Sequence, residues 1–260
     1  MINLPTLLPP SIDKAVENLT DKPTQVFGSG VAAILSLVFN PIIHFADKQR
    51  EKYLRNLEIY KQEIQANLDA IPDEKRIEPK LQVVAQALED SKYCIEEPDL
   101  RGMFANLIAS ASNATKADVV HPSFSVILKQ MSSQDASVIR RIKQEIDKRG
   151  AGLPVAKLEQ TVPDGSGKLT ITKDIIIPEP SKLLQVIHPD SLSSLFAFGL
   201  ITIDYSQHFA AEGAYLHFEQ YADADGYKAK AERENGVIEI KKGICELTPY
   251  GQNFSRACGL

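Results

Sequence analysis

One glycine-rich stretch of the sequence looks like a phosphate-binding loop. Gly-Ser-Gly-Lys occupies 165–168, and in such loops a lysine after glycine reaches the phosphates of a nucleotide. The complete motif also needs a glycine five residues before the second one and a hydroxyl residue after the lysine. Val162 and Leu169 hold these two places. We therefore expect a hairpin turn here, and no ATP site.

A second stretch, "YADADGYKAKAE", carries acidic residues at part of the spacing of a calcium loop. Asp223, Asp225, Gly226 and Glu232 would be the third, fifth, sixth and twelfth residues of that loop. Tyr221 replaces the first ligand, and the flanking sequence does not read as two helices. We expect an acidic loop between strands rather than a calcium site.

The histidines and cysteines do not form a recognisable catalytic or metal motif. No serine or cysteine has a base beside it at a known spacing, G-x-S-x-G is absent, and no C-x-x-C pair occurs. We expect no catalytic, cofactor-binding or metal-binding residue and favour a protein that is not an enzyme. A site assembled from residues far apart in the sequence stays open as an alternative. The residues concerned are His44, His121, His188, His208, His217, Cys94, Cys245 and Cys258.

Composition indicates an ordinary globular protein. The 260 residues are 43% hydrophobic and 24% charged, and the formal net charge is -5. Such a chain has no overall positive field that would attract it to nucleic acid or to anionic lipid, so binding to either would need a local basic patch. The first twenty residues lack the pattern of a cleaved signal peptide, and we expect a cytoplasmic protein.

The first half of the sequence predicts helices. Residues 47–70 are rich in charge, with apolar residues at alternating steps of three and four, which is typical of a long amphipathic helix. Further helices are expected over 77–88, from Pro98 onward, and over 122–131. We expect a helical N-terminal domain over 1–120.

After residue 131 the pattern changes to mixed helix and strand. A helix capped by the serines before Gln134 should end at Gly150, and a β-branched strand should follow the turn at 164–165. A helix over 190–199 runs into a strand over 201–203, and strands over 237–240 and 244–247 precede a helix that starts at Thr248. His208 and His217 fall in an expected aromatic loop.

These elements predict a mainly α protein. Its C-terminal domain, 121–260, should be an α+β winged-helix-like unit with a small antiparallel β-hairpin, because a helix, a strand and a hairpin follow one another. The expected recognition helix, 190–199, holds serines and no basic residue. DNA binding is therefore possible but not favoured.

An uncharged run, 26–45, precedes the amphipathic helix. Asn40-Pro41 interrupts it and leaves an apolar helix of about 21 Å at ~1.5 Å per residue, shorter than a hydrocarbon core of about 30 Å. Gly28, Ala32 and Ser36 recur every four residues, and such a stripe lets another helix approach closely. The run is predicted as a helix-packing element, and conditional entry into a membrane stays open.

The sequence contains the stretches "IPDEKRIEP", "LRGMFANLIASA" and "VHPSFSVILKQMSSQDA" within 71–136, and "LTPYGQNFSRACG" near its end. The first three stretches, and more loosely the fourth, resemble the Abi-alpha (abortive infection alpha) family of bacterial proteins. This resemblance implies a role in defence against phage, and it implies no reaction, cofactor or catalytic residue.

Together these observations predict a non-enzymatic defence protein without a cofactor. We expect it to act through self-association as a homo-oligomer, through a protein partner, or through conditional membrane interaction of 26–45. The expected location is the cytoplasm, with membrane association through 26–45 left open. The alternative is a winged-helix transcriptional regulator that binds DNA.

Overall fold

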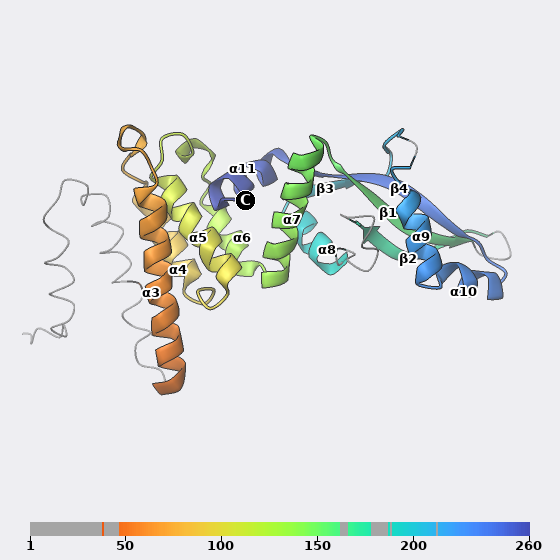
Figure 1. Ribbon diagram of the computed structural model, residues 1–260, viewed down its shortest axis with the longest axis horizontal. Coiled ribbons are helices and arrows are strands. Elements are labelled where there is room, and N and C mark those ends of the chain that lie inside the picture. The colour runs from red at the N-terminus through yellow and green to blue at the C-terminus, as the bar shows by residue number, and fades with distance from the viewer. Residues whose placement is uncertain (1–37, 39–46, 162–165, 178–186, 188, 212) are drawn as a thin grey trace, which may run out of the picture.

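The computed structural model describes residues 38, 47–161, 166–177, 187, 189–211 and 213–260. The predicted stripe Gly28, Ala32 and Ser36 and nearly all of the run 26–45 lie outside these residues, as does the expected turn at 164–165. The described chain is mostly helical with a small four-stranded antiparallel sheet. It is elongated, with helices gathered at one end and the sheet at the other (Figure 1). The predicted mainly α class is confirmed in this coarse form.

The helical end is built around α5, Pro98–Ala111, which is buried along most of its length. Around it pack α3, Asp47–Asp69, α4, Leu81–Ser91, and α6, Ser123–Gln130. Two short 3₁₀ helices connect these elements, η2 at Asp73–Lys75 and η3 at Ala117–Val119.

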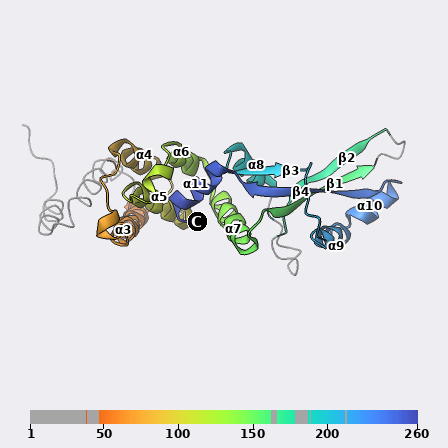
Figure 2. The same ribbon diagram turned by 90° about the horizontal axis from the view of Figure 1, so that it is seen from above.

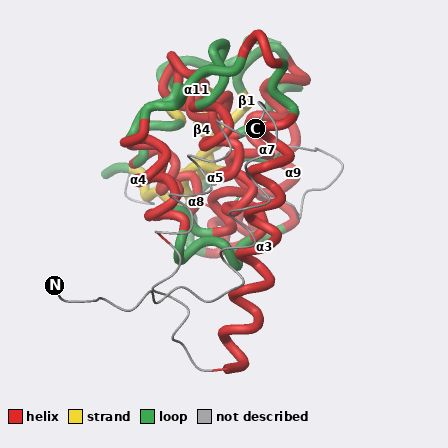
Figure 3. The backbone as a smooth tube through the Cα atoms, turned by 90° about the vertical axis from the view of Figure 1, so that its left-hand side faces the viewer, coloured by secondary structure: helices red, strands yellow, loops and turns green. Residues whose placement is uncertain are grey.

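The long helix α3 confirms the amphipathic prediction for 47–70. Its inner stripe buries Leu57, Tyr60, Ile64 and Leu68 against the core, and these residues follow the predicted three-and-four spacing. The N-terminal end of α3 extends beyond the other described elements (Figures 1 and 3). Leu57 is the first buried side chain described on this helix, and Tyr53 before it is half-buried against the core.

The helix α7, Ser133–Arg149, begins and ends as its sequence predicts. The Ser132 hydroxyl accepts a hydrogen bond from the Asp135 amide, and the Asp135 carboxylate accepts one from the Ser132 amide. Gly150 closes the helix in the left-handed conformation, with φ of 67°. α7 connects the two ends of the molecule, because it packs on α5 and then leads into the sheet.

The sheet has the strand order β2-β1-β4-β3. Its strands are β1, Leu153–Thr161, β2, Lys168–Ile175, β3, Ile201–Asp204, and β4, Ile238–Leu247. α8, Pro189–Ala197, leads into β3 as predicted. The remaining helices are α9, Leu216–Ala224, α10, Tyr227–Arg233, and α11, Pro249–Cys258. α9 packs on one face of the sheet, and α10 adjoins the same face (Figure 2).

Two predictions for this half are wrong in detail. The strands expected at 237–240 and 244–247 form the single strand β4, because Lys241, Lys242 and Gly243 pair continuously with β1. The loop expected around His217 and the acidic stretch is largely helical, since it forms α9 and α10. The small hairpin expected from the strands at 237–240 and 244–247 is therefore not formed, and the antiparallel neighbours β1 and β2 are a different pair. The winged-helix assignment stays a prediction.

One hydrophobic cluster extends from Leu57 to Cys258. α11 follows the sheet in sequence, yet it returns to pack on α5 in the helical end. The Ser110 hydroxyl of α5 donates a hydrogen bond of 2.8 Å to the Ala257 carbonyl of α11. The predicted units 1–120 and 121–260 therefore share core residues, and the division between them stays a prediction.

Candidate functional site

Those of the residues singled out from the sequence that the structure describes do not assemble into one site. Lys168, from the phosphate-loop-like stretch, forms an ion pair with Glu239 of β4. Asp223 forms an ion pair of 3.0 Å with Lys228 at the α9–α10 turn. No group of three or more histidines, cysteines and acids in the described part of the chain is placed to hold a metal.

The described histidines lie apart from one another. His121 contacts Ser123 at the start of α6, His208 is exposed, and His217 is buried on α9. His44 and His188 lie outside the described residues. The structure therefore brings no two of the described histidines into a shared site.

All three cysteines are buried free thiols. Burial raises the pKa of the Cys245 thiol to about 12, and it raises the pKa of the Cys94 and Cys258 thiols as well. A cysteine acts as a nucleophile in its thiolate form, which these environments disfavour at neutral pH. The thiols therefore belong to the core rather than to a reactive site.

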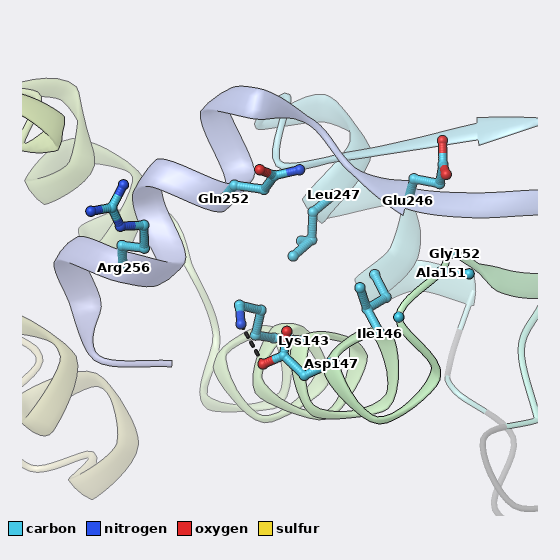
Figure 4. Close-up of a pocket in the computed structure, with 10 residues that line it drawn as sticks. Lys143, Ile146, Asp147, Ala151, Gly152, Glu246, Leu247, Gln252 and Arg256 are labelled. Atoms are coloured by element: carbon cyan, nitrogen blue, oxygen red, sulfur yellow. Dashed lines mark hydrogen bonds and ion pairs between the residues drawn. The ribbon is translucent and has the colours of Figure 1, made fainter.

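A pocket of about 560 Å³ lies where the helical end meets the sheet. Its walls come from the second half of α7, the turn before β1, the end of β4 and the outer side of α11 (Figure 4). This volume is in the range of pockets that hold small molecules. The lining residues are Lys143, Ile146, Asp147, Gly150, Ala151, Gly152, Glu246, Leu247, Gln252 and Arg256.

Charge is unevenly distributed in this pocket. Lys143 of α7 forms an ion pair with Asp147 one turn later. Arg256 and Glu246 form no ion pair or side-chain hydrogen bond with any described residue. Lys143 and Arg256 lie toward one end of the pocket and Glu246 toward the other, with Leu247 and Ile146 between them (Figure 4). The Arg256 guanidinium points away from Lys143, Gln252 and Leu247 (Figure 4), so the charged groups that border the pocket do not converge on one point.

A second feature joins two segments distant in sequence. The Ser123 hydroxyl lies 2.5 Å from His121 Nδ1 and also forms a hydrogen bond with the Tyr250 hydroxyl at the start of α11. The rings of Phe124 and Tyr250 are 5.1 Å apart, and those of Phe124 and Phe254 are 5.4 Å apart, both edge to face. This contact fixes α6 against α11 beside the core.

The expected recognition helix presents no positive charge. The exposed residues of α8 are Asp190, Ser193, Phe196 and Ala197. Groove-reading helices use arginine, lysine, asparagine or glutamine to contact bases. The described face of α8 therefore lacks the side chains of a DNA reader.

The model of the family described as abortive infection alpha matches residues 52–258. The chain belongs to this family. The abortive infection alpha match begins within α3 and ends at the last residue of α11, so the pocket and the Ser123–Tyr250 contact both fall inside it. No curated protein and no solved structure matches the chain.

The pocket was not predicted from the sequence. Its polar residues come from three separate elements, α7, β4 and α11. Taken alone, each of them looks like an exposed polar residue of an amphipathic element. The one local signal is the i, i+4 spacing of Gln252 and Arg256, which places both on one face of α11. That spacing is common on solvated helices and does not identify a ligand.

No helix in the described part of the chain has the length and apolar character needed to cross a membrane. The run 26–45 lies outside that part, apart from Val38, which is half-buried against the core.

Proposed function

We propose that this protein defends bacterial cells against phage by abortive infection, and that it acts through association rather than through chemistry of its own. Family membership over residues 52–258 is the observation that carries the proposal. Phage plating with and without the gene tests it. Expression should reduce plating efficiency or burst size, and unchanged values for phages of several types would overturn it.

We propose self-association through the run 26–45 as the mechanism. The projecting end of α3 supports this, because the run directly precedes a helix whose N-terminal end extends beyond the other described elements (Figure 3). The small-residue stripe Gly28, Ala32 and Ser36 would let two such helices approach closely. A membrane-bound form is the alternative state of the same segment.

Size measurement of the purified full chain and carbonate washing of cell membranes test this mechanism. Ala32→Leu should reduce the assembly size, since it fills the stripe. Ala33→Leu is the matched control, because it makes the same change about 100° away around a helix. Equal assembly size for both variants and the parent would contradict self-association through the stripe, and carbonate-resistant membrane retention would favour the membrane form.

For the second half we propose a winged-helix-like unit used for protein contact. The strand order β1-β4-β3 and the passage from α8 into β3 support this proposal. α9 and α10 lie between β3 and β4, where a winged helix has the short turn of its β-hairpin, so the unit would be a variant of that fold. A gel shift at low salt on DNA from upstream of the gene should be negative, and a salt-sensitive shift would contradict the proposal.

A further inference from the structure

The helices α9 and α10 pack on one face of the sheet through a hydrophobic cluster of their own (Figure 2). None of the described residues from 213 to 236 belongs to the larger cluster that contains α5. We call residues 213–236 the cover, because their apolar side chains lie over this face of the sheet. The buried residues of the smaller cluster are Ala156, Leu158, Ile175, Ile177, Tyr215, Phe218 and Ala222.

The larger cluster is complete without the cover. It joins α3, α4, α5, α6, α7, α8 and α11 to other parts of the sheet. Lifting the cover from the sheet would expose residues of the smaller cluster and leave the packing of α5 and α11 in place. Hydrophobic stabilisation grows with the apolar area that is buried, so the smaller cluster holds the cover less firmly than the larger one holds the core.

Polar contacts tie the cover to the sheet near its two ends. The Tyr215 hydroxyl, just before α9, donates a hydrogen bond of 2.8 Å to the Gly243 carbonyl of β4. The Gln160 side-chain amide of β1 donates one of 3.0 Å to the Glu234 carboxylate. The hydroxyl of Tyr215 can therefore be removed without changing a contact of the larger cluster.

One buried group opposes the closed position of the cover. His217 of α9 is buried, and its Nε2 atom has no hydrogen-bond partner among the described residues. A polar atom that leaves water without gaining a partner costs free energy, and opening of the cover would return Nε2 to water. The closed state thus combines a small apolar contact with a desolvation cost, as is expected of a segment that opens.

We propose that the cover opens as a unit while the larger cluster stays folded. Opening uncovers the apolar face of the sheet formed by Leu158, Ile175 and Ile240. This face is closed to other molecules in the structure, so the cover controls access to it. The inference is independent of the role in phage defence.

Hydrogen exchange of the full chain, followed by mass spectrometry at several low urea concentrations, tests the proposal. Peptides from α9 and α10 should exchange at least about tenfold faster than peptides from α5. Their rates should also depend less on urea, because opening of the cover exposes less surface than unfolding of the whole chain.

Tyr215→Phe should raise the exchange rates of α9 and α10 by about fivefold and leave those of α5 as in the parent, because it removes a hydrogen bond that only the closed cover makes. Tyr250→Phe is the matched control, since it removes a hydroxyl beside the larger cluster. It should raise the exchange rates of α5 and leave those of α9 and α10 unchanged.

A cysteine on the covered face separates opening of the whole cover from fraying of its helices. Leu158→Cys should react with a thiol reagent at least about tenfold faster than the three native cysteines, which are buried in the larger cluster. Adding Tyr215→Phe should increase this rate by about fivefold.

Three results would overturn the proposal. The first is equal exchange of α5, α9 and α10 with the same urea dependence. The second is an effect of Tyr215→Phe on the same helices as Tyr250→Phe. The third is a Leu158→Cys thiol that reacts no faster than the native cysteines in a variant that circular dichroism shows to be folded.

Discussion

The Ser123 hydroxyl of α6 and the Tyr250 hydroxyl of α11 are hydrogen-bonded to each other across 127 positions of sequence. Ser123 also contacts His121 Nδ1, so three side chains form a short hydrogen-bonded chain. Both segments belong to the stretches that resemble the abortive infection alpha family, "VHPSFSVILKQMSSQDA" and "LTPYGQNFSRACG". These two stretches, far apart in sequence, therefore contact each other in the fold.

Tyr250→Phe should lower the free energy of unfolding by about 1 kcal/mol, because it removes the hydrogen bond and keeps the ring contact with Phe124. Ser123→Ala should have a similar effect. Urea unfolding of the two single variants and the double variant measures the coupling between them. Strictly additive losses would mean that the two hydroxyls do not interact in solution.

The Arg101 guanidinium on α5 is buried, and its Nε lies 3.1 Å from the Glu63 carboxylate of α3. It also donates to the Ile95 carbonyl. Glu63→Ala leaves this charge without its carboxylate, and we expect a loss of about 2 kcal/mol in the free energy of unfolding, reduced from the fully buried case because Glu63 is partly exposed.

Glu58→Ala is the control for this change. Glu58 is an exposed residue of the same helix, and its carboxylate lies 3.8 Å from the Lys61 ammonium. We expect a loss of less than about 0.5 kcal/mol. Equal losses for Glu63→Ala and Glu58→Ala in chemical unfolding would show that the Arg101 pair contributes no more than a surface pair.

Gly251 in α11 lies directly against the end of the loop that precedes β3. A Cβ atom at this position would be 1.9 Å from the Leu200 carbonyl oxygen, which also accepts a hydrogen bond from the Thr248 amide. Gly251→Ala should therefore destabilise the protein by about 3 kcal/mol, measured by urea unfolding. Gly102→Ala in α5 meets nothing within 4 Å and should stabilise by up to about 1 kcal/mol. If both variants changed the free energy of unfolding by the same amount in the same direction, the close contact between Gly251 and Leu200 would be refuted.

His217 is buried on α9, and its Nε2 has no hydrogen-bond partner among the described residues. Burial lowers its pKa from the ordinary 6.5, and the nearby charge of Arg149 lowers it further. The unfolded chain then binds the proton more readily than the folded chain does. The contribution of the neutral, buried His217 to the free energy of unfolding is present above pH 6.5 and is lost as the pH falls below that value.

The free energy of unfolding should therefore decrease between pH 7 and pH 5, and His217→Leu should make this dependence shallower. His208→Leu, at an exposed histidine, serves as control and should leave the slope as it is in the parent. Denaturant unfolding at several pH values provides the comparison. An unchanged slope in His217→Leu would assign the dependence to other groups.

Elements with local signals were predictable from the sequence. Ser132 and Gly150 mark the ends of α7, and Thr248 caps α11 by accepting a hydrogen bond from the Gly251 amide. These contacts involve residues close in sequence, so composition and spacing reveal them.

Elements that depend on contacts between residues far apart in the sequence could not be predicted from it. β1 is buried nearly throughout its first half and so lacks the alternation of a half-exposed strand. Lys242 and Gly243 look like a turn, yet in β4 the Lys242 ammonium lies 5.4 Å from the centroid of the Tyr215 ring, and Gly243 leaves room for Tyr205. The pocket depends in the same way on α11 returning to the side of α7, which no local pattern encodes.

The return of α11 to the helical end has a consequence for synthesis. Phe254, Ala257 and Cys258 complete a core whose other members begin at Leu57. During translation, the face of α5 that packs on α11 therefore stays uncovered until the sheet and α11 have left the ribosome. A nascent chain halted anywhere before residue 249 would expose this face. Chaperone capture should therefore be strongest late in translation and should end abruptly when α11 emerges.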